Sequence, residues 1–148
     1  MSYEEFRRDA LSKIEKFGRI VIAVAGGDNS FSYTVGNCQR GLPELLIVGP
    51  FEPTGIRSVL NVMTDKMIER GSAFEENTLI DIGAPLHCTA FHASDLAKLE
   101  RTIQVGQLLK RPYDLMQVVS PDPAGLFPWQ PGCNPAFQVP LYRATPMN

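Results

Sequence analysis

Proline is concentrated near the end of this chain, where six of the twelve prolines lie between Pro121 and Pro140. Proline lacks a backbone N–H and its ring clashes with a preceding helical turn, so such a segment sustains neither a helix nor a full strand ladder. The segment also contains Phe127 and Trp129 and few charges, whereas disordered tails are usually polar and charged. We therefore expect residues 120–148 to be irregular but ordered, and packed against the domain or a partner.

The composition is that of an ordinary soluble globular domain. The 148 residues carry a formal net charge of -2 and 44% of them are hydrophobic, which suits one domain with its own core. No stretch approaches the roughly 20 apolar residues that span a bilayer, and the N-terminus lacks a secretion signal, so we expect a cytoplasmic protein without membrane contact. Lys and Arg are scattered, so we expect no nucleic-acid partner. Cys38, Cys88 and Cys133 lie far apart, which predicts reduced thiols.

Helical and strand patterns alternate along the chain before the proline-rich segment. Apolar residues recur at helical spacing from Ser2 to Phe17, and Gly18 suits the end of that helix. Further helices are predicted from Pro53 to Arg70 and from Ser94 to Arg111, and strands at 19–24, 31–36, 44–49, 78–81, 86–93 and 115–119. The glycine-containing segment 25–30 lies between two strands and leads into no helix, which favours a hairpin turn over a phosphate-binding loop.

These elements predict an α+β fold for a single domain spanning residues 1–148. The loops between the first three strands are too short for parallel crossovers, so neighbouring strands should be antiparallel. We predict a mainly antiparallel sheet of about five or six strands, with barrel-like closure as one option, together with three helices. The third predicted strand is apolar on both faces and should be central or covered by a helix.

Two motifs stand out within this pattern. One is FSYTVG at residues 31–36, followed by GLPEL at residues 41–45, and the other is QVVSPDPAGLFPW at residues 117–129. Together they resemble the bacterial family of domains of unknown function numbered 4262. That family often has His where this chain has Leu42, and Trp where this chain has Ser120. The resemblance implies membership of an uncharacterised family and carries over no activity.

The two histidines, with a cysteine close by, are the obvious candidates for acid-base or metal chemistry. His87 and His92 are five residues apart, so on one strand they would point to opposite faces. Cys88 and His92 would share a face but lie about 13 Å apart along it. A shared metal is therefore not expected. Each histidine stays a candidate catalytic acid or base, with a hydrogen-bonded structural role as the alternative.

The two motifs also contain the polar and aromatic groups of a small-ligand site. We predict that Tyr33, Gln117, Asp122 and Trp129 line a pocket between the sheet and a tail folded back over it. The alternative interpretation is that Asp122 holds a turn between two prolines and Trp129 fills the core.

Three functions stay open on this basis. The first is small-molecule binding, with or without catalysis, in the pocket between sheet and tail. The second is a protein-interaction module or homodimer in which the tail docks on a partner chain. The third, on fold analogy alone, is a flavin-binding split barrel, although no residue requires a cofactor.

Overall fold

A computed structural model describes residues 2–26 and 30–146, so part of the predicted turn at 25–30 lies outside the described residues. The helices are α1 (Tyr3–Phe17), α2 (Pro53–Arg70), α3 (Asp95–Glu100) and α4 (Ile103–Leu109), the strands are β1 (Ile20–Val24), β2 (Phe31–Val35), β3 (Glu44–Val48), β4 (Thr89–His92) and β5 (Leu115–Val119), and the 3₁₀ helices are η2 (Asn37–Arg40) and η3 (Pro135–Phe137). None of the helices within this part of the chain is long and apolar enough to cross a membrane.

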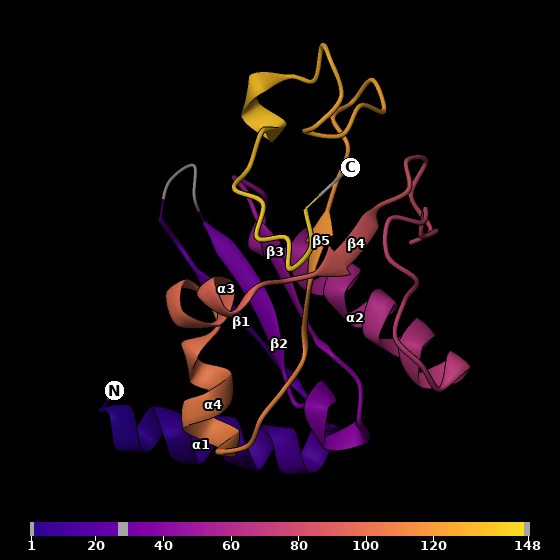
Figure 1. The fold of residues 1–148 in the computed structure, drawn as a ribbon. Coiled ribbons are helices and arrows are strands. Elements are labelled where there is room, and N and C mark those ends of the chain that lie inside the picture. The colour runs from indigo at the N-terminus through magenta and orange to yellow at the C-terminus, as the bar shows by residue number, and fades with distance from the viewer. Residues whose placement is uncertain (1, 27–29, 147–148) are drawn as a thin grey trace.

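The five strands form one sheet in the order β1-β2-β3-β5-β4 (Figure 1). This confirms the predicted α+β class, with two differences in detail. The β3–β5 pair is parallel, so the sheet is mixed, and over the described residues it is open rather than closed into a barrel. The parallel pair arises because the chain between β3 and β5 is long enough to contain α2, β4, α3 and α4, which gives room for a crossover.

Two predicted elements are shorter or divided in the structure. The helix predicted from Ser94 is interrupted at Arg101 and Thr102, so α3 and α4 replace a single helix. The strand predicted at 78–81 is reduced to an isolated bridge between Ile80 and Cys88.

Helices cover both faces of the sheet. Because side chains alternate along a strand, Leu46 and Val48 of β3 pack with α1, α3 and α4, whereas Leu45 and Ile47 pack with α2. Every residue of β3 and β5 is buried, which agrees with the central position predicted for the strand that is apolar on both faces.

The proline-rich tail returns to the sheet next to β4. The N–H of Ala144 donates to the carbonyl of His92 (2.9 Å), and the N–H of Ser94 donates to the carbonyl of Tyr142 (2.7 Å). In Figure 1 this segment runs from the end of β5 up through η3 and back down beside β4. The tail is therefore hydrogen-bonded to its own domain, and apart from η3 its described part is made of turns and extended chain.

Candidate functional site

Two of the four predicted ligand residues lie in one row across the sheet. The strand registers place Tyr33 next to Leu46, Leu46 next to Gln117, and Gln117 next to Phe91. The side chains of Tyr33 and Gln117 therefore lie on the same face of the sheet, with Leu46 between them. Both are fully buried, and burial raises the pKa of Tyr33 far above its usual value.

Gln117 is bonded to the tail rather than to open space. Its Nε2 donates to the carbonyl of Pro140 (2.8 Å), and its Oε1 accepts from the N–H of Tyr142 (2.8 Å). This side-chain amide thus fixes the irregular tail to the sheet. Both polar atoms of the buried amide, and both backbone groups of the tail that meet them, therefore have hydrogen-bond partners, as buried polar atoms require.

Asp122 organises the loop that begins the tail. Its Oδ1 accepts from the N–H groups of Ala124 (2.9 Å) and Leu126 (2.9 Å), and its Oδ2 accepts from the N–H of Asn134 (2.9 Å). The bond from Asn134, followed by that from Leu126, holds the pKa of Asp122 below its usual value. This geometry matches the alternative interpretation in which Asp122 holds a turn.

Trp129 belongs to a stack of rings and one guanidinium. Its ring stacks on that of Phe127 with centroids 5.1 Å apart. The guanidinium carbon of Arg143 lies 4.8 Å from the Trp129 centroid and 4.1 Å from the Phe91 centroid. Burial lowers the pKa of Arg143, and its Nη1 donates to Asn77 Oδ1 (3.0 Å). The stack joins the tail to β4 by aromatic and cation–π contacts.

The structure therefore brings Gln117 and Trp129 together around Phe91, but places Asp122 in its own loop and Tyr33 two strands away. None of the four lines any of the surface grooves described below, and the polar atoms of Gln117 and Asp122 have partners within the chain. Their role as ligand contacts stays a prediction.

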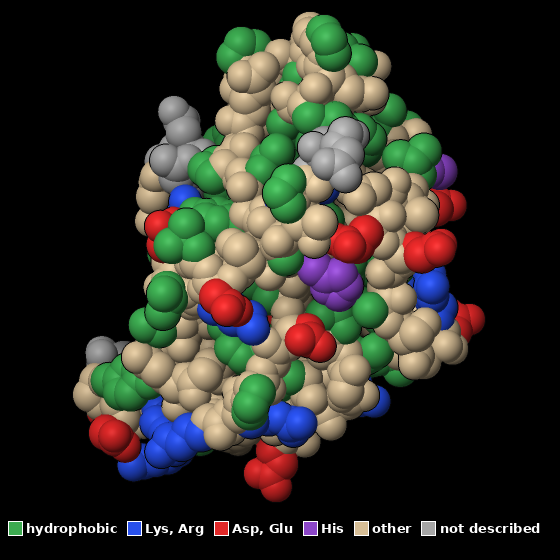
Figure 2. All heavy atoms as spheres, viewed as in Figure 1, with side chains coloured by type: hydrophobic (Ala, Val, Ile, Leu, Met, Phe, Trp, Pro, Cys, Tyr) green, Lys and Arg blue, Asp and Glu red, His purple; other side chains and the backbone are tan. Residues whose placement is uncertain are grey.

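His87 and His92 are both exposed. The Nε2 of His87 lies 4.0 Å from Asp81 Oδ1, and the backbone N–H of His92 donates to Glu76 Oε2 (2.8 Å). Figure 2 shows histidine side chains at the surface of the face drawn. Among the described residues, no three or more His, Cys, Asp and Glu side chains form a group that could hold a metal ion.

A surface groove with a volume of about 690 Å³ lies between α1, β1 and α2. Its apolar lining comes from Phe6, Ala10, Phe17, Ile20 and Val21, and its polar lining from Asp9, Lys13, Arg19, Arg57 and Asn61. Sequence reasoning missed this groove, because its walls come from three elements whose separation no local pattern specifies. The one local signal of this groove is that the first helix carries both a charged residue, Lys13, and an exposed aromatic residue, Phe17, which line it together.

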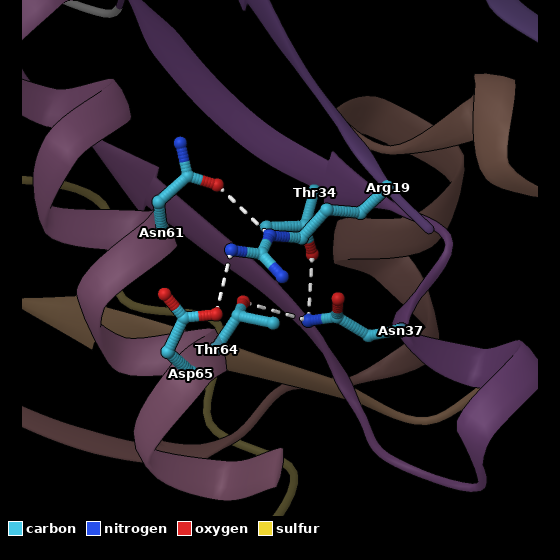
Figure 3. A network of polar contacts seen from close by, with 6 residues as sticks. All are labelled: Arg19, Thr34, Asn37, Asn61, Thr64 and Asp65. Carbon is cyan, nitrogen blue, oxygen red and sulfur yellow. Dashed lines mark hydrogen bonds and ion pairs between the residues drawn. The ribbon is translucent and has the colours of Figure 1, made fainter. Parts of the chain in front are cut away.

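Arg19 is held in a fixed position at this groove (Figure 3). Its Nε donates to Asn61 Oδ1 (2.9 Å) and its Nη2 donates to Asp65 Oδ1 (2.8 Å), both on α2. Only 17% of its side chain is exposed. The planar guanidinium is therefore oriented before any ligand arrives, which reduces the entropy lost on binding.

A buried polar cluster lies beside this arginine. The Nδ2 of Asn37 donates to Thr64 Oγ1 (3.0 Å), to Thr34 Oγ1 (3.3 Å) and to the carbonyl of Pro43 (3.2 Å). Its Oδ1 is buried and accepts no hydrogen bond from the described residues. Such an oxygen can accept a bond from a bound water molecule or ligand N–H.

Glu44 lies at the other end of the same cluster. Its Oε1 accepts from Thr34 Oγ1 (2.8 Å) and the Asn37 N–H (3.1 Å), while its Oε2 accepts from the N–H groups of Gly36 (3.0 Å) and Cys38 (3.0 Å). Burial raises the pKa of Glu44, against the effect of these hydrogen bonds. The four bonds fix the turn at η2, so this carboxyl group has a structural role.

Cys38 is the cysteine nearest to a groove, and its surroundings oppose reactivity. A second groove, of about 550 Å³, is lined by Cys38 together with Leu42, Arg111 and Tyr113. Burial, followed by the neighbouring Glu44 charge, raises the pKa of the Cys38 thiol to about 12. Since the thiolate is the nucleophile, this thiol is inert near neutral pH.

A family model, "Domain of unknown function (DUF4262)", matches residues 13–134, which is most of the chain. The chain belongs to the DUF4262 family. No curated protein matches it, and no solved structure does.

In this DUF4262 domain the two motifs that carry the resemblance have visible structural roles. The first motif supplies Thr34, Gly36 and Glu44 to the buried cluster. The second supplies Gln117 and Asp122, which attach and shape the tail. Both motifs therefore specify how loops are held to the sheet, and the groove beside α1 lies close to the buried cluster that the first of them forms.

Proposed function

We propose that this domain binds a small organic anion with an apolar body in the groove between α1, β1 and α2. The observation that carries the proposal is a groove of about 690 Å³ that combines an apolar lining with an arginine already held in place. Small-molecule sites usually have volumes of roughly 300–1,000 Å³, are mostly apolar, and contain a few fixed polar groups.

Charge determines which kind of ligand this groove favours. The lining contains three cations, Lys13, Arg19 and Arg57, and one carboxylate, Asp9. Lys13 pairs with Asp9 (3.0 Å) and Arg19 pairs with Asp65 (2.8 Å), so Arg57 is the lining cation without an ion pair among the described residues, and it gives the groove its net positive charge. An anionic head group near the arginines, with its apolar body against the Phe6 and Phe17 side of the groove, satisfies both parts of the lining.

The functions predicted from sequence receive less support. The pocket predicted between sheet and tail would need polar atoms of Gln117 and Asp122 that are already bonded within the chain. The tail that was to dock on a partner is hydrogen-bonded to its own domain. The flavin alternative depended on a barrel, and the described sheet is open. The candidate acids or bases, His87 and His92, lie outside the groove lining, so no catalytic step is proposed.

Binding to the full chain is tested with octanoate, octanol and octylammonium as probes, by calorimetry and by the shift in melting temperature. A ligand that binds only the native state raises apparent stability as its concentration exceeds its dissociation constant. We expect saturable binding of octanoate and weaker binding of both other probes. Equal binding of octanol would contradict the role assigned to the arginines, and no saturable binding of any probe would contradict the site.

Two matched variants on the same helix locate the anion. Arg57→Gln removes a groove cation from α2, and Arg70→Gln removes the same charge from the far end of α2, outside the groove. The first should weaken octanoate binding about tenfold, as expected for loss of one charge-assisted contact, and the second should leave it unchanged. Trp129→Ala separates this site from the predicted sheet–tail pocket, because it should affect octanoate binding only if the ligand lies under the tail.

A further inference from the structure

β1 lies at one end of the sheet and, among the strands of the described residues, pairs with β2 alone (Figure 1). The direction of its backbone groups follows from β2. The N–H of Gly49 donates to the carbonyl of Ser30 (2.8 Å), so Ser30 bonds toward β3. Because the backbone N–H and C=O groups of successive residues point to opposite sides of a strand, those of Tyr33, three residues after Ser30, point toward β1. The N–H and C=O groups of its register partner, Ile22, therefore point inward, toward β2.

Val21 and Ala23 therefore turn their N–H and C=O groups away from the sheet. No backbone or side-chain group among the described residues bonds to them on that side. Residues 23–26 are exposed, and Val24 retains 39% of its accessible surface. An open row of donors and acceptors of this kind is complementary to another extended strand.

We propose that β1 pairs antiparallel with β1 of a second copy of this chain, about a two-fold axis at Ile22. In that register Val21 of each copy lies opposite Ala23 of the other, and these residues exchange N–H···O=C bonds. The five residues of β1 carry no charge and no proline, so two copies bring no like charges together. The two five-stranded sheets become one continuous sheet.

The second copy is favoured over an unrelated strand because the pairing is self-complementary and closed. A two-fold contact uses the same patch on both chains and satisfies both open rows at once. The opposite end of each sheet, at β4, is already bonded to other parts of its own chain, so further copies cannot add there. The assembly therefore stops at two chains.

Substitutions at Ala23 test the pairing directly. Ala23→Pro removes the outward N–H without breaking a β1–β2 hydrogen bond, since Ala23 bonds outward, and proline is tolerated at strand edges. Ala23→Lys keeps the N–H but puts a charge on the exposed edge, a common way to block strand pairing. Ala23→Thr is the matched control, because it keeps both the N–H and an uncharged side chain suited to strands.

Light scattering and sedimentation of the full-length chain, at concentrations from about 1 to 300 µM, measure the outcome. We expect the wild type and Ala23→Thr to have the mass of two chains at high concentration, and the proline and lysine variants to dissociate at least tenfold more readily. Circular dichroism shows whether each variant is folded. If the proline variant is unfolded, the lysine variant alone tests the pairing. A wild type that is monomeric at every concentration overturns the proposal. A dimer that neither variant weakens also overturns it, and would indicate an interface elsewhere, such as the tail.

Discussion

The two edges of the sheet are finished in different ways. At β4, the outward groups of Cys88, Ala90 and His92 are bonded by Ile80, Asn77, Glu76 and Ala144 from other parts of the chain. At β1, the outward groups of Val21 and Ala23 have no such bonds among the described residues. Both strands are short and neither contains proline or lysine, the residues that often protect an edge strand, so these signals do not distinguish the covered edge from the open one.

The difference shows what the proline-rich tail contributes. The described part of the tail has no regular structure beyond η3, yet it places Arg143 over Phe91 and supplies one bond at the outer edge of β4, from the Ala144 N–H to the His92 carbonyl. The other bonds along that edge come from residues 76–80. Proline lowers the conformational entropy of the unfolded tail, so ordering an irregular segment costs less. At β1, no segment among the described residues makes equivalent bonds, so this edge is available for binding.

The largest expected effect comes from removing the ring under the tail. Phe91→Ala deletes a fully buried side chain and should lower the free energy of unfolding by about 3–5 kcal/mol. Val24→Ala on the open edge, where the residue is 39% exposed, should lower the free energy of unfolding by about 0.5 kcal/mol. Urea denaturation at a concentration where the chain is monomeric measures both. Similar losses for the two variants would show that the edges do not differ in the way described.

The next effect concerns the amide that joins the tail to the sheet. Gln117→Met keeps the size of the side chain but leaves the Tyr142 N–H and the Pro140 carbonyl without their partner. Leaving such groups buried and unsatisfied should lower the free energy of unfolding by about 1–3 kcal/mol. Gln107→Met, at an exposed position on α4, is the control and should change it little. If both variants are equally stable, the amide does not hold the tail.

A pH-dependent effect is expected at Asp122. Its pKa is lower in the folded chain than in the unfolded chain, so its charged form stabilises the fold. The contribution is fully present above the unfolded value of about 3.9 and is lost as pH falls through the lower folded value. Asp122→Asn should therefore be less stable than the wild type at pH 6, and the difference should shrink below pH 4. A difference that is constant from pH 6 to pH 2 would contradict this assignment.

The smallest signal is local. Under dilute conditions the amides of Val21 and Ala23 should exchange with solvent faster than those of Ile22 and Val24, which point toward β2. Raising the protein concentration should slow exchange at Val21 and Ala23 if β1 pairs with a second copy. The amide of Tyr142, which is bonded within the chain, should be unaffected by concentration. Hydrogen exchange followed by NMR resolves these residues separately.

The sequence predicted more of the fold than of the site. Periodicity located α1, α2 and the five strands, because a strand buried on both faces is mostly apolar, as β3 is from Leu45 to Val48. It did not predict the parallel β3–β5 pair, which depends on where a long crossover returns. It selected Gln117, Asp122 and Trp129 as important residues, but their bonding partners are up to 25 residues away in the chain.

By itself, the sequence determined the α+β class, the family, and an aromatic tail too poor in charge to resemble a disordered one. Only the tertiary structure decided which edge that tail covers, which edge stays open, and where a groove forms beside Arg19. The physical reason is one of range. Propensity and alternation act over a few neighbouring residues, whereas an open edge or a groove is defined by segments that are far apart in the chain and meet only after folding.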